Sequence, residues 1–171
     1  MSCTQSITSI HTTSLALVIR KLSRLGLHNL TTSMSKIQTT NKFEKAFVKF
    51  LNVFDEWNLE WVGDKNLCYD AKGFTPKGNK CVVEMKFRTK YYDTKLLEKM
   101  KYDSLMALPN DITKIYFVSD PKGSYWFWLD KLSEMKVFDK HCPTTSYWND
   151  RKKSKEVYLL SEETASIVHK I

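Results

Sequence analysis

The chain has 171 residues, of which 42% are hydrophobic and 13% aromatic, enough for one compact domain with its own core. Its apolar runs are all too short to cross a bilayer, so we expect no contact with a membrane. The formal net charge is +8. A basic chain of this kind favours contact with a polyanion, because neutralised phosphates release their condensed counterions.

The cysteines and histidines do not form a metal-binding pattern. Four cysteines and four histidines are scattered along the chain, and none completes the spacing of a zinc site. Cys68 and Cys81 fall inside predicted strands, where we expect buried free thiols. Free thiols are typical of a reducing compartment, so we expect an intracellular, cytoplasmic protein.

Residues 1–40 form a basic N-terminal extension with four Lys or Arg residues and no acidic residue. Its apolar and basic side chains separate at helical spacing, which is typical of a mitochondrial transit peptide. Two alternatives stay open: residues 1–33 are a disordered or accessory segment, or Met34 is the natural start. A mitochondrial location is therefore the alternative to a cytoplasmic one.

Residues 41–171 read as one domain, beginning with a helix over 43–54. Asn41 and Glu44 have the spacing of a capping box at the start of this helix. Alternating and apolar runs then predict a short strand over 59–62 and two longer strands over 67–74 and 80–88. The Pro, Gly and Asn residues between the two longer strands predict a hairpin.

The second half continues the alternation of helix and strand. We expect a helix over 94–108 that ends before Pro109, then strands over 114–119 and 125–129 joined by a turn. The aromatic run 125–128 indicates a strand buried on both faces or a dimer surface. A strand over 157–160 and a helix from Ser161 complete the prediction, which is an α/β domain.

The strand over 80–88 carries the most informative pattern. Side chains alternate across a strand, so Glu84 and Lys86 share one face while Met85 and Phe87 point into a core. Asp70 lies on the preceding strand. If the two strands pair as a hairpin, Asp70 approaches Glu84 and Lys86, which brings two carboxylates and an ammonium together.

Such a trio suits metal-assisted phosphoryl chemistry. Mg²⁺ prefers oxygen ligands and is usually held by one or two carboxylates, waters and substrate phosphate. The metal lowers the pKa of a bound water, and a neighbouring lysine orients that water or stabilises charge on phosphate oxygens. A surface hairpin with an ordinary cross-strand ion pair is the alternative interpretation.

Asp70 and the segment Glu84-Met85-Lys86 resemble the motif of the PD-(D/E)xK nuclease superfamily, and the match covers residues 41–129. The resemblance implies a restriction-endonuclease-like α-β-β-β-α-β core, with a mixed central sheet flanked by helices. It implies Mg²⁺ or Mn²⁺ held by Asp70, Glu84 and the Met85 carbonyl, with Lys86 beside the attacking water. The sequence departs from the family pattern in having Tyr69 where a proline usually precedes the first Asp.

Further residues are predicted around this trio. Members of the superfamily often add a carboxylate from the first helix, so Glu44 is a candidate fourth catalytic acid, with the capping role as its competitor. On the helix over 94–108, Lys99 is either a phosphate contact or the partner of Asp103 in an ordinary ion pair, whereas Lys95 more simply belongs to a solvated face. The predicted nucleic-acid contacts are Lys72, Lys80, Arg88, Lys90 and Lys99.

The sequence therefore predicts a metal-dependent deoxyribonuclease that hydrolyses phosphodiester bonds, as an endonuclease or a Holliday-junction-resolvase-like enzyme. We expect DNA as its partner, with branched or single-stranded forms included, and a homodimer as a hypothesis. Two alternatives are an inactive nucleic-acid-binding module on the same fold, and a protein–protein interaction or inhibitor domain that uses the aromatic strand.

Overall fold

The computed structural model describes residues 36–65, 67–133, 135–143 and 152–170. Most of the predicted N-terminal extension lies outside these residues, so its role as a targeting or accessory segment stays a prediction. Within the described part of the chain, no helix is both long enough and apolar enough to cross a membrane.

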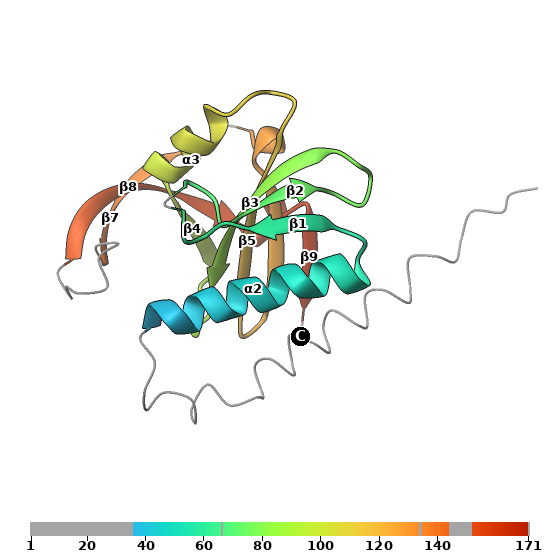
Figure 1. Cartoon of the computed structure of the whole chain (residues 1–171). Coiled ribbons are helices and arrows are strands. Elements are labelled where there is room, and N and C mark those ends of the chain that lie inside the picture. The colour runs from blue at the N-terminus through green and yellow to red at the C-terminus, as the bar shows by residue number, and fades with distance from the viewer. Residues whose placement is uncertain (1–35, 66, 134, 144–151, 171) are drawn as a thin grey trace, which may run out of the picture.

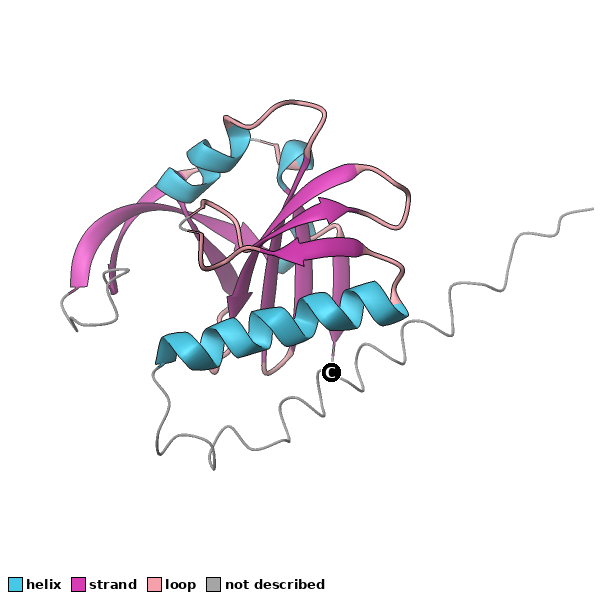
Figure 2. Ribbon diagram, in the orientation of Figure 1, coloured by secondary structure: helices cyan, strands magenta, loops and turns pink. Residues whose placement is uncertain are grey.

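Two helices and nine strands form the described domain (Figures 1 and 2). In chain order they are α2 (Lys36–Phe54), β1 (Asn58–Trp61), β2 (Ala71–Phe74), β3 (Lys80–Phe87), β4 (Thr94–Glu98), α3 (Lys99–Met106), β5 (Thr113–Asp120), β6 (Gly123–Trp128), β7 (Val137–Pro143), β8 (Lys152–Ser161) and β9 (Ile167–Lys170). Short 3-10 turns at Leu129–Lys131 and Glu162–Thr164 follow β6 and β8.

The central sheet has the strand order β1-β2-β3-β5-β6-β9. Strand β3 pairs in parallel with β5, and the other neighbours in this sheet are antiparallel. The connection from β3 to β5 passes through α3, as a parallel pair requires a crossover. The predicted α/β class, with a mixed central sheet flanked by helices, is confirmed.

Helix α2 covers one face of the central sheet (Figure 2). Its apolar side chains, among them Phe47 and Leu51, pack against the odd-numbered residues of β3 and β5 and against Trp126 of β6. Phe47 stacks on Phe117 of β5 with ring centroids 4.3 Å apart. The pattern of apolar residues at helical spacing thus buries one stripe of α2, as the sequence predicts.

The opposite face of the central sheet is also buried. Here α3 and the second sheet, with the order β4-β8-β7, cover even-numbered residues of β3 and β5 together with Tyr125 and Phe127 of β6. Strands β3, β5 and β6 are therefore covered on both faces, as is typical of a sheet between two layers. The interpretation of the aromatic run as a strand buried on both faces is confirmed.

The predicted helix over 94–108 is wrong in its first part. Residues Thr94–Glu98 form β4, which pairs antiparallel with β8, and the helix comprises only Lys99–Met106. Lys95 and Leu97 are buried while their neighbours are more exposed, which is the two-residue period of a strand. Pairing with a strand distant in sequence overrides the local helical preference.

The limits of two other helices also differ from the prediction. Helix α2 begins at Lys36, five residues before Asn41. The predicted helix from Ser161 is wrong, because the chain makes one 3-10 turn and then forms β9 against β6. Cys81 is buried in β3 and Cys68 is half-buried before β2, and both are free thiols.

Lys95 joins the two sheets through a buried ion pair. Its ammonium lies 2.6 Å from a carboxylate oxygen of Asp120 in β5 and 3.0 Å from one of Glu162. The same ammonium lies over the ring of Tyr125, 4.0 Å from its centroid. Because Lys95 is only 3% exposed, these contacts replace the water that a lysine normally keeps, and the predicted solvated position is wrong.

We expect Lys95→Ala to lower the free energy of unfolding by about 3–5 kcal/mol, because it leaves the carboxylate of Asp120 buried and unpaired. The matched control is Lys99→Ala, which removes an exposed pair with Asp103 and should cost less than about 1 kcal/mol. Urea unfolding of both variants measures the difference. Equal losses would contradict a structural role for Lys95.

Candidate active site

The pairing of β2 with β3 places Asp70 beside Glu84. The register joins Ala71 to Val83, so the residue before Ala71 lies next to the residue after Val83. The backbone N–H of Asp70 donates to the Val83 carbonyl at 2.9 Å, and the N–H of Met85 donates to Oδ2 of Asp70 at 2.7 Å. The first bond fixes the backbone of Asp70 against β3, and the second holds its carboxylate there, just before β2 begins.

Glu84 is the most buried acid of this cluster, with 2% of its surface exposed. Its Oε1 accepts a hydrogen bond from the ammonium of Lys101 in α3, whereas its Oε2 is buried without a hydrogen-bond partner. Burial, and then the negative charge of Asp70, raise the pKa of Glu84 to about 8. The site therefore holds a buried carboxyl group with a hydrogen-bond partner at Oε1 and none at Oε2.

Two lysines lie close to Glu84. Burial lowers the pKa of Lys86, and the Glu84 carboxylate only partly opposes this effect. Burial also tends to lower the pKa of Lys101, but the charge and hydrogen bond of Glu84 outweigh it, and the net shift is upward. Lys101 is thus the ammonium held to Glu84, while Lys86 loses its proton more readily than an exposed lysine does.

Glu44 reaches the same cluster from α2. It is 6% exposed, and the indole N–H of Trp61 donates to its Oε2 at 2.9 Å. Burial and the charge of Asp70 raise the pKa of Glu44 to about 7, while Lys86 and Lys101 oppose this shift. The capping role is wrong, because α2 begins at Lys36 and its first turn contains no acidic residue.

A small cavity opens beside Glu84. It has a volume of about 20 Å³, which is room for a single water or ion. Its walls come from β3, β4, α3 and β5. The lining residues are Glu84, Lys86, Arg88, Leu96, Leu97, Glu98, Lys101 and Tyr116.

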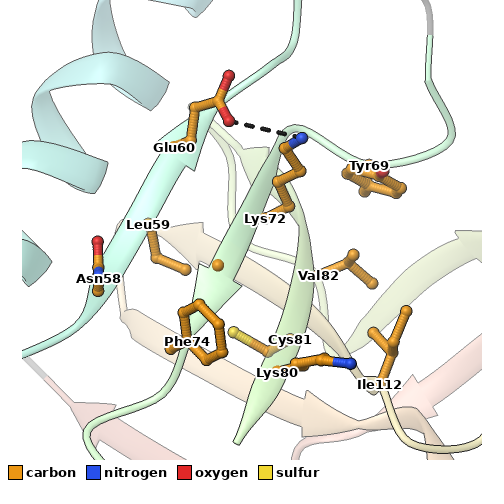
Figure 3. A pocket seen from close by; sticks show the side chains of 11 residues that line it. Asn58, Leu59, Glu60, Tyr69, Lys72, Phe74, Lys80, Cys81, Val82 and Ile112 are labelled. Atoms are coloured by element: carbon orange, nitrogen blue, oxygen red, sulfur yellow. Dashed lines mark ion pairs between the residues drawn. The ribbon is translucent and has the colours of Figure 1, made fainter. Parts of the chain in front are cut away.

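A larger hollow of about 440 Å³ lies over β1, β2 and β3 (Figure 3). Lys72 and Lys80 line it, but each lysine is already paired, with Glu60 at 3.5 Å and with Asp111 at 3.0 Å respectively. The hollow offers one carboxylate, Glu60, which Lys72 and Lys65 neutralise. The chemistry therefore points to the small cavity at Glu84 and not to the larger hollow.

The predicted nucleic-acid contacts are spread over the surface. Arg88 lines the cavity at Glu84, whereas Lys80 lies four residues before Glu84, about 13 Å along the strand. Lys99 forms the predicted ion pair with Asp103, at 2.6 Å. Lys90 is exposed in the loop after β3. Of these residues and Lys72, only Arg88 lines the small cavity, and all five roles stay predictions.

Sequence reasoning missed Lys101, although a signal was present. Leu105 is buried and lies four residues after Lys101 in α3. A lysine four residues before a core residue of the same helix lies on the same face as that residue, toward the interior. On this helix the sequence predicts Lys99 as the phosphate contact, and Lys99 instead lies beside Asp103 at the surface.

The acids around Glu84 suit a hard divalent cation with few protein ligands. Within the described ranges, no group of three or more His, Cys, Asp or Glu residues is arranged to hold a metal ion. Asp70, Glu84 and the Met85 carbonyl could supply three oxygens, and Mg²⁺ commonly takes its remaining ligands from water and phosphate. The buried, partnerless Oε2 of Glu84 fits such an ion, because a cation would supply its missing partner.

The comparisons with known proteins are sparse. No family model matches the chain, and no curated protein matches it. Among solved structures, the chain is similar to Hjc, a Holliday junction resolvase from Archaeoglobus fulgidus, with 10% sequence identity and a TM-score of 0.48. The similarity covers 76% of this chain and 89% of that one, but it is too distant to support an argument about activity.

The raised pKa values predict how stability depends on pH. Glu84 and Glu44 bind a proton more tightly in the folded chain than in the unfolded chain. Their protonated forms therefore stabilise the fold at low pH, and this contribution is lost as the pH rises through about 7 to 8. Without divalent cations, we expect the free energy of unfolding to fall between about pH 5 and 8, by about 1.4 kcal/mol for each unit of raised pKa.

Urea unfolding at several pH values measures this dependence, and Glu84→Gln should flatten it. Glu60→Gln is the matched control, because this exposed acid has a lowered pKa and should leave the decline in place. An unchanged decline in Glu84→Gln would contradict the assigned burial of this carboxylate.

Proposed function

We propose that the chain is a metal-dependent nuclease that hydrolyses phosphodiester bonds in DNA. One observation carries the proposal: Glu84 is buried beside Asp70 with one carboxylate oxygen unpaired, and Lys86 and Lys101 lie next to it. Burying one acid beside a second, half-buried acid is costly for folding, and a structural role does not require it. A site for a cation and a polyanion explains the cost.

Asp70, Glu84 and the carbonyl of Met85 would hold Mg²⁺ or Mn²⁺. When bound, the ion would supply positive charge to a phosphate oxygen and lower the pKa of a coordinated water. The hydrogen bond from the Met85 N–H to Asp70 orients this carboxylate, so the two acids are positioned before any ion arrives.

Lys86 would orient the attacking water and take part in its deprotonation. Its lowered pKa favours this role, because burial makes the amine of Lys86 give up its proton more readily than an exposed lysine does. Lys101 would hold its proton at Nζ. It neutralises Glu84 in the absence of a cation, and its ammonium would then face the charge of the phosphate.

Glu44 would act as a fourth acid, at the edge of the cluster. Its Oε2 is held by the Trp61 indole, which leaves Oε1 to orient a water molecule beside Asp70. The net charge of +8 supports DNA as the substrate. Branched or single-stranded DNA, and a homodimer, stay predictions.

The burial of the aromatic strand argues against a protein–protein interaction domain that would use this strand as its surface. Tyr125, Trp126 and Phe127 are buried between the two layers and cannot meet a partner. An inactive DNA-binding module remains the competing function. It has no use for a buried acid with an unpaired oxygen beside a second acid, so the observation at Glu84 favours the nuclease.

We expect Asp70→Asn, Glu84→Gln and Lys86→Ala each to reduce Mg²⁺-dependent DNA cleavage about 100-fold or more, because each removes a charge on which the reaction depends. Cleavage of labelled plasmid, single-stranded and branched DNA, with and without EDTA, measures this. Lys77→Ala is the control, since this exposed lysine lies in the β2–β3 turn and should cleave at the wild-type rate.

Equal background cleavage by the wild type and Lys86→Ala under every metal would overturn the nuclease assignment. DNA binding without cleavage would then support the inactive module.

A thermal shift provides a second readout that does not depend on activity. Mg²⁺ or Mn²⁺ should stabilise the wild type by about 2.7 kcal/mol at 100 times Kd, because the ion binds only the folded chain. The stabilisation should be larger at pH 8 than at pH 5.5, since Glu84 must lose its proton to bind. Asp70→Asn should show little stabilisation, and a full response in this variant would refute the ligand assignment.

A further inference from the structure

Strands β7 and β8 extend beyond the rest of their sheet as a ribbon of two strands. Strand β4 pairs only with residues 157–161 of β8, so residues 152–156 pair with β7 residues 139–143 and with no other described strand. This part of β7 and β8, which we call the β-ribbon, curves away from the body of the domain (Figure 1). Its length is about 16 Å at the usual rise per residue.

The β-ribbon is open to solvent on both sides. Where side chains are described, all of its residues are exposed except Cys142 and Lys155, which are half-buried. A two-stranded ribbon without a covered face is only marginally stable in water. The β-ribbon is therefore stabilised either by the part of β8 that pairs with β4 or by a binding partner.

The two faces of the β-ribbon differ in charge. The register places Lys140 opposite Lys155 and Cys142 opposite Lys153, and these residues share one face. This lysine face, defined by Lys140, Lys153 and Lys155, contains no acid. Asp139 and Glu156 face each other on the opposite side. Like charges thus lie opposite each other on both faces, and such pairs weaken a strand pair unless a partner of opposite charge meets them.

The lysine face begins at the wall of the candidate active site. The ammonium of Lys155 lies 2.9 Å from Oε1 of Glu98, and Glu98 lines the small cavity together with Glu84 and Lys101. A chain of phosphates lying along Lys140 and Lys153 would therefore lead toward that cavity.

We propose that the β-ribbon is an arm that holds duplex DNA, with its lysine face against the phosphates. The proposal rests on the proposed function for its choice of DNA as the polyanion. The major groove, about 12 Å wide, admits a two-stranded ribbon, so the shape of the arm suits a duplex as well as its charge does. A second copy of the chain fits less well, because pairing along this edge would bring lysines close to lysines.

The test compares two double variants that remove the same charge. Lys140→Gln/Lys153→Gln neutralises the free part of the lysine face and leaves the Lys155–Glu98 pair intact. The control, Lys49→Gln/Lys77→Gln, changes exposed lysines on α2 and on the β2–β3 turn. Fluorescence anisotropy with a short labelled duplex in EDTA measures affinity across a series of salt concentrations, without cleavage.

We expect the lysine-face variant to bind duplex DNA about tenfold or more weakly near physiological salt, with a salt dependence smaller by about two counterions. The control should keep the wild-type affinity and slope. The melting temperature of the lysine-face variant should not fall, since it loses a repulsive pair. Equal losses of affinity in both variants, or none in either, would overturn the arm.

Sedimentation equilibrium of the same variants tests whether the β-ribbon instead binds a second copy of the chain. Affinity that falls only because a dimer dissociates would overturn DNA docking in favour of an interface between copies. The experiments distinguish an error in the β-ribbon proposal from an error in the nuclease proposal. A wild type that binds through the lysine face but never cleaves refutes the nuclease alone, whereas cleavage with an unaffected lysine-face variant refutes the arm alone.

Discussion

The buried carboxylate of Glu84 is the constraint around which the rest of the structure is arranged. A charge in the interior needs a partner, and the fold provides only part of one: Lys101 meets Oε1, while Oε2 has none. Asp70 adds repulsion instead of relief. The chain accepts a local cost in stability here, and costs of this kind concentrate at functional sites.

Strand β3 can carry this charge because it lies in the middle of the domain. Its odd-numbered residues pack under α2, and its pairing with β2 and β5 fixes the strand on both sides. The even-numbered face then offers Glu84 and Lys86 to the layer formed by α3 and β4. A rigid central strand thus holds the acids in place while their surroundings supply the cations.

The second sheet connects the site to the surface. Lys95 of β4 forms an ion pair with Asp120 of the central sheet, and β4 pairs with β8. Through Lys155 and Glu98 the base of the β-ribbon meets the wall of the cavity. One continuous set of contacts therefore runs from the core ion pair to the exposed lysines.

Local patterns in the sequence determined the alternation of β3, the hairpin before it and the apolar stripe of α2. Each of these depends on residues within a few positions of one another, and periods of two and 3.6 residues reveal them directly. The same alternation put Glu84 and Lys86 on one face, and the pairing of the hairpin brought Asp70 beside Glu84.

Only the tertiary structure decided the rest. Residues Thr94–Glu98 became a strand because β8, distant in sequence, pairs with them, and Lys95 is buried because Asp120 and Glu162 meet it there. Lys101 reaches Glu84 because the crossover lays α3 over β3, and Glu44 joins the cluster because Trp61 and α2 meet at the edge of the sheet. Such contacts depend on chain closure over tens of residues, which no local period records.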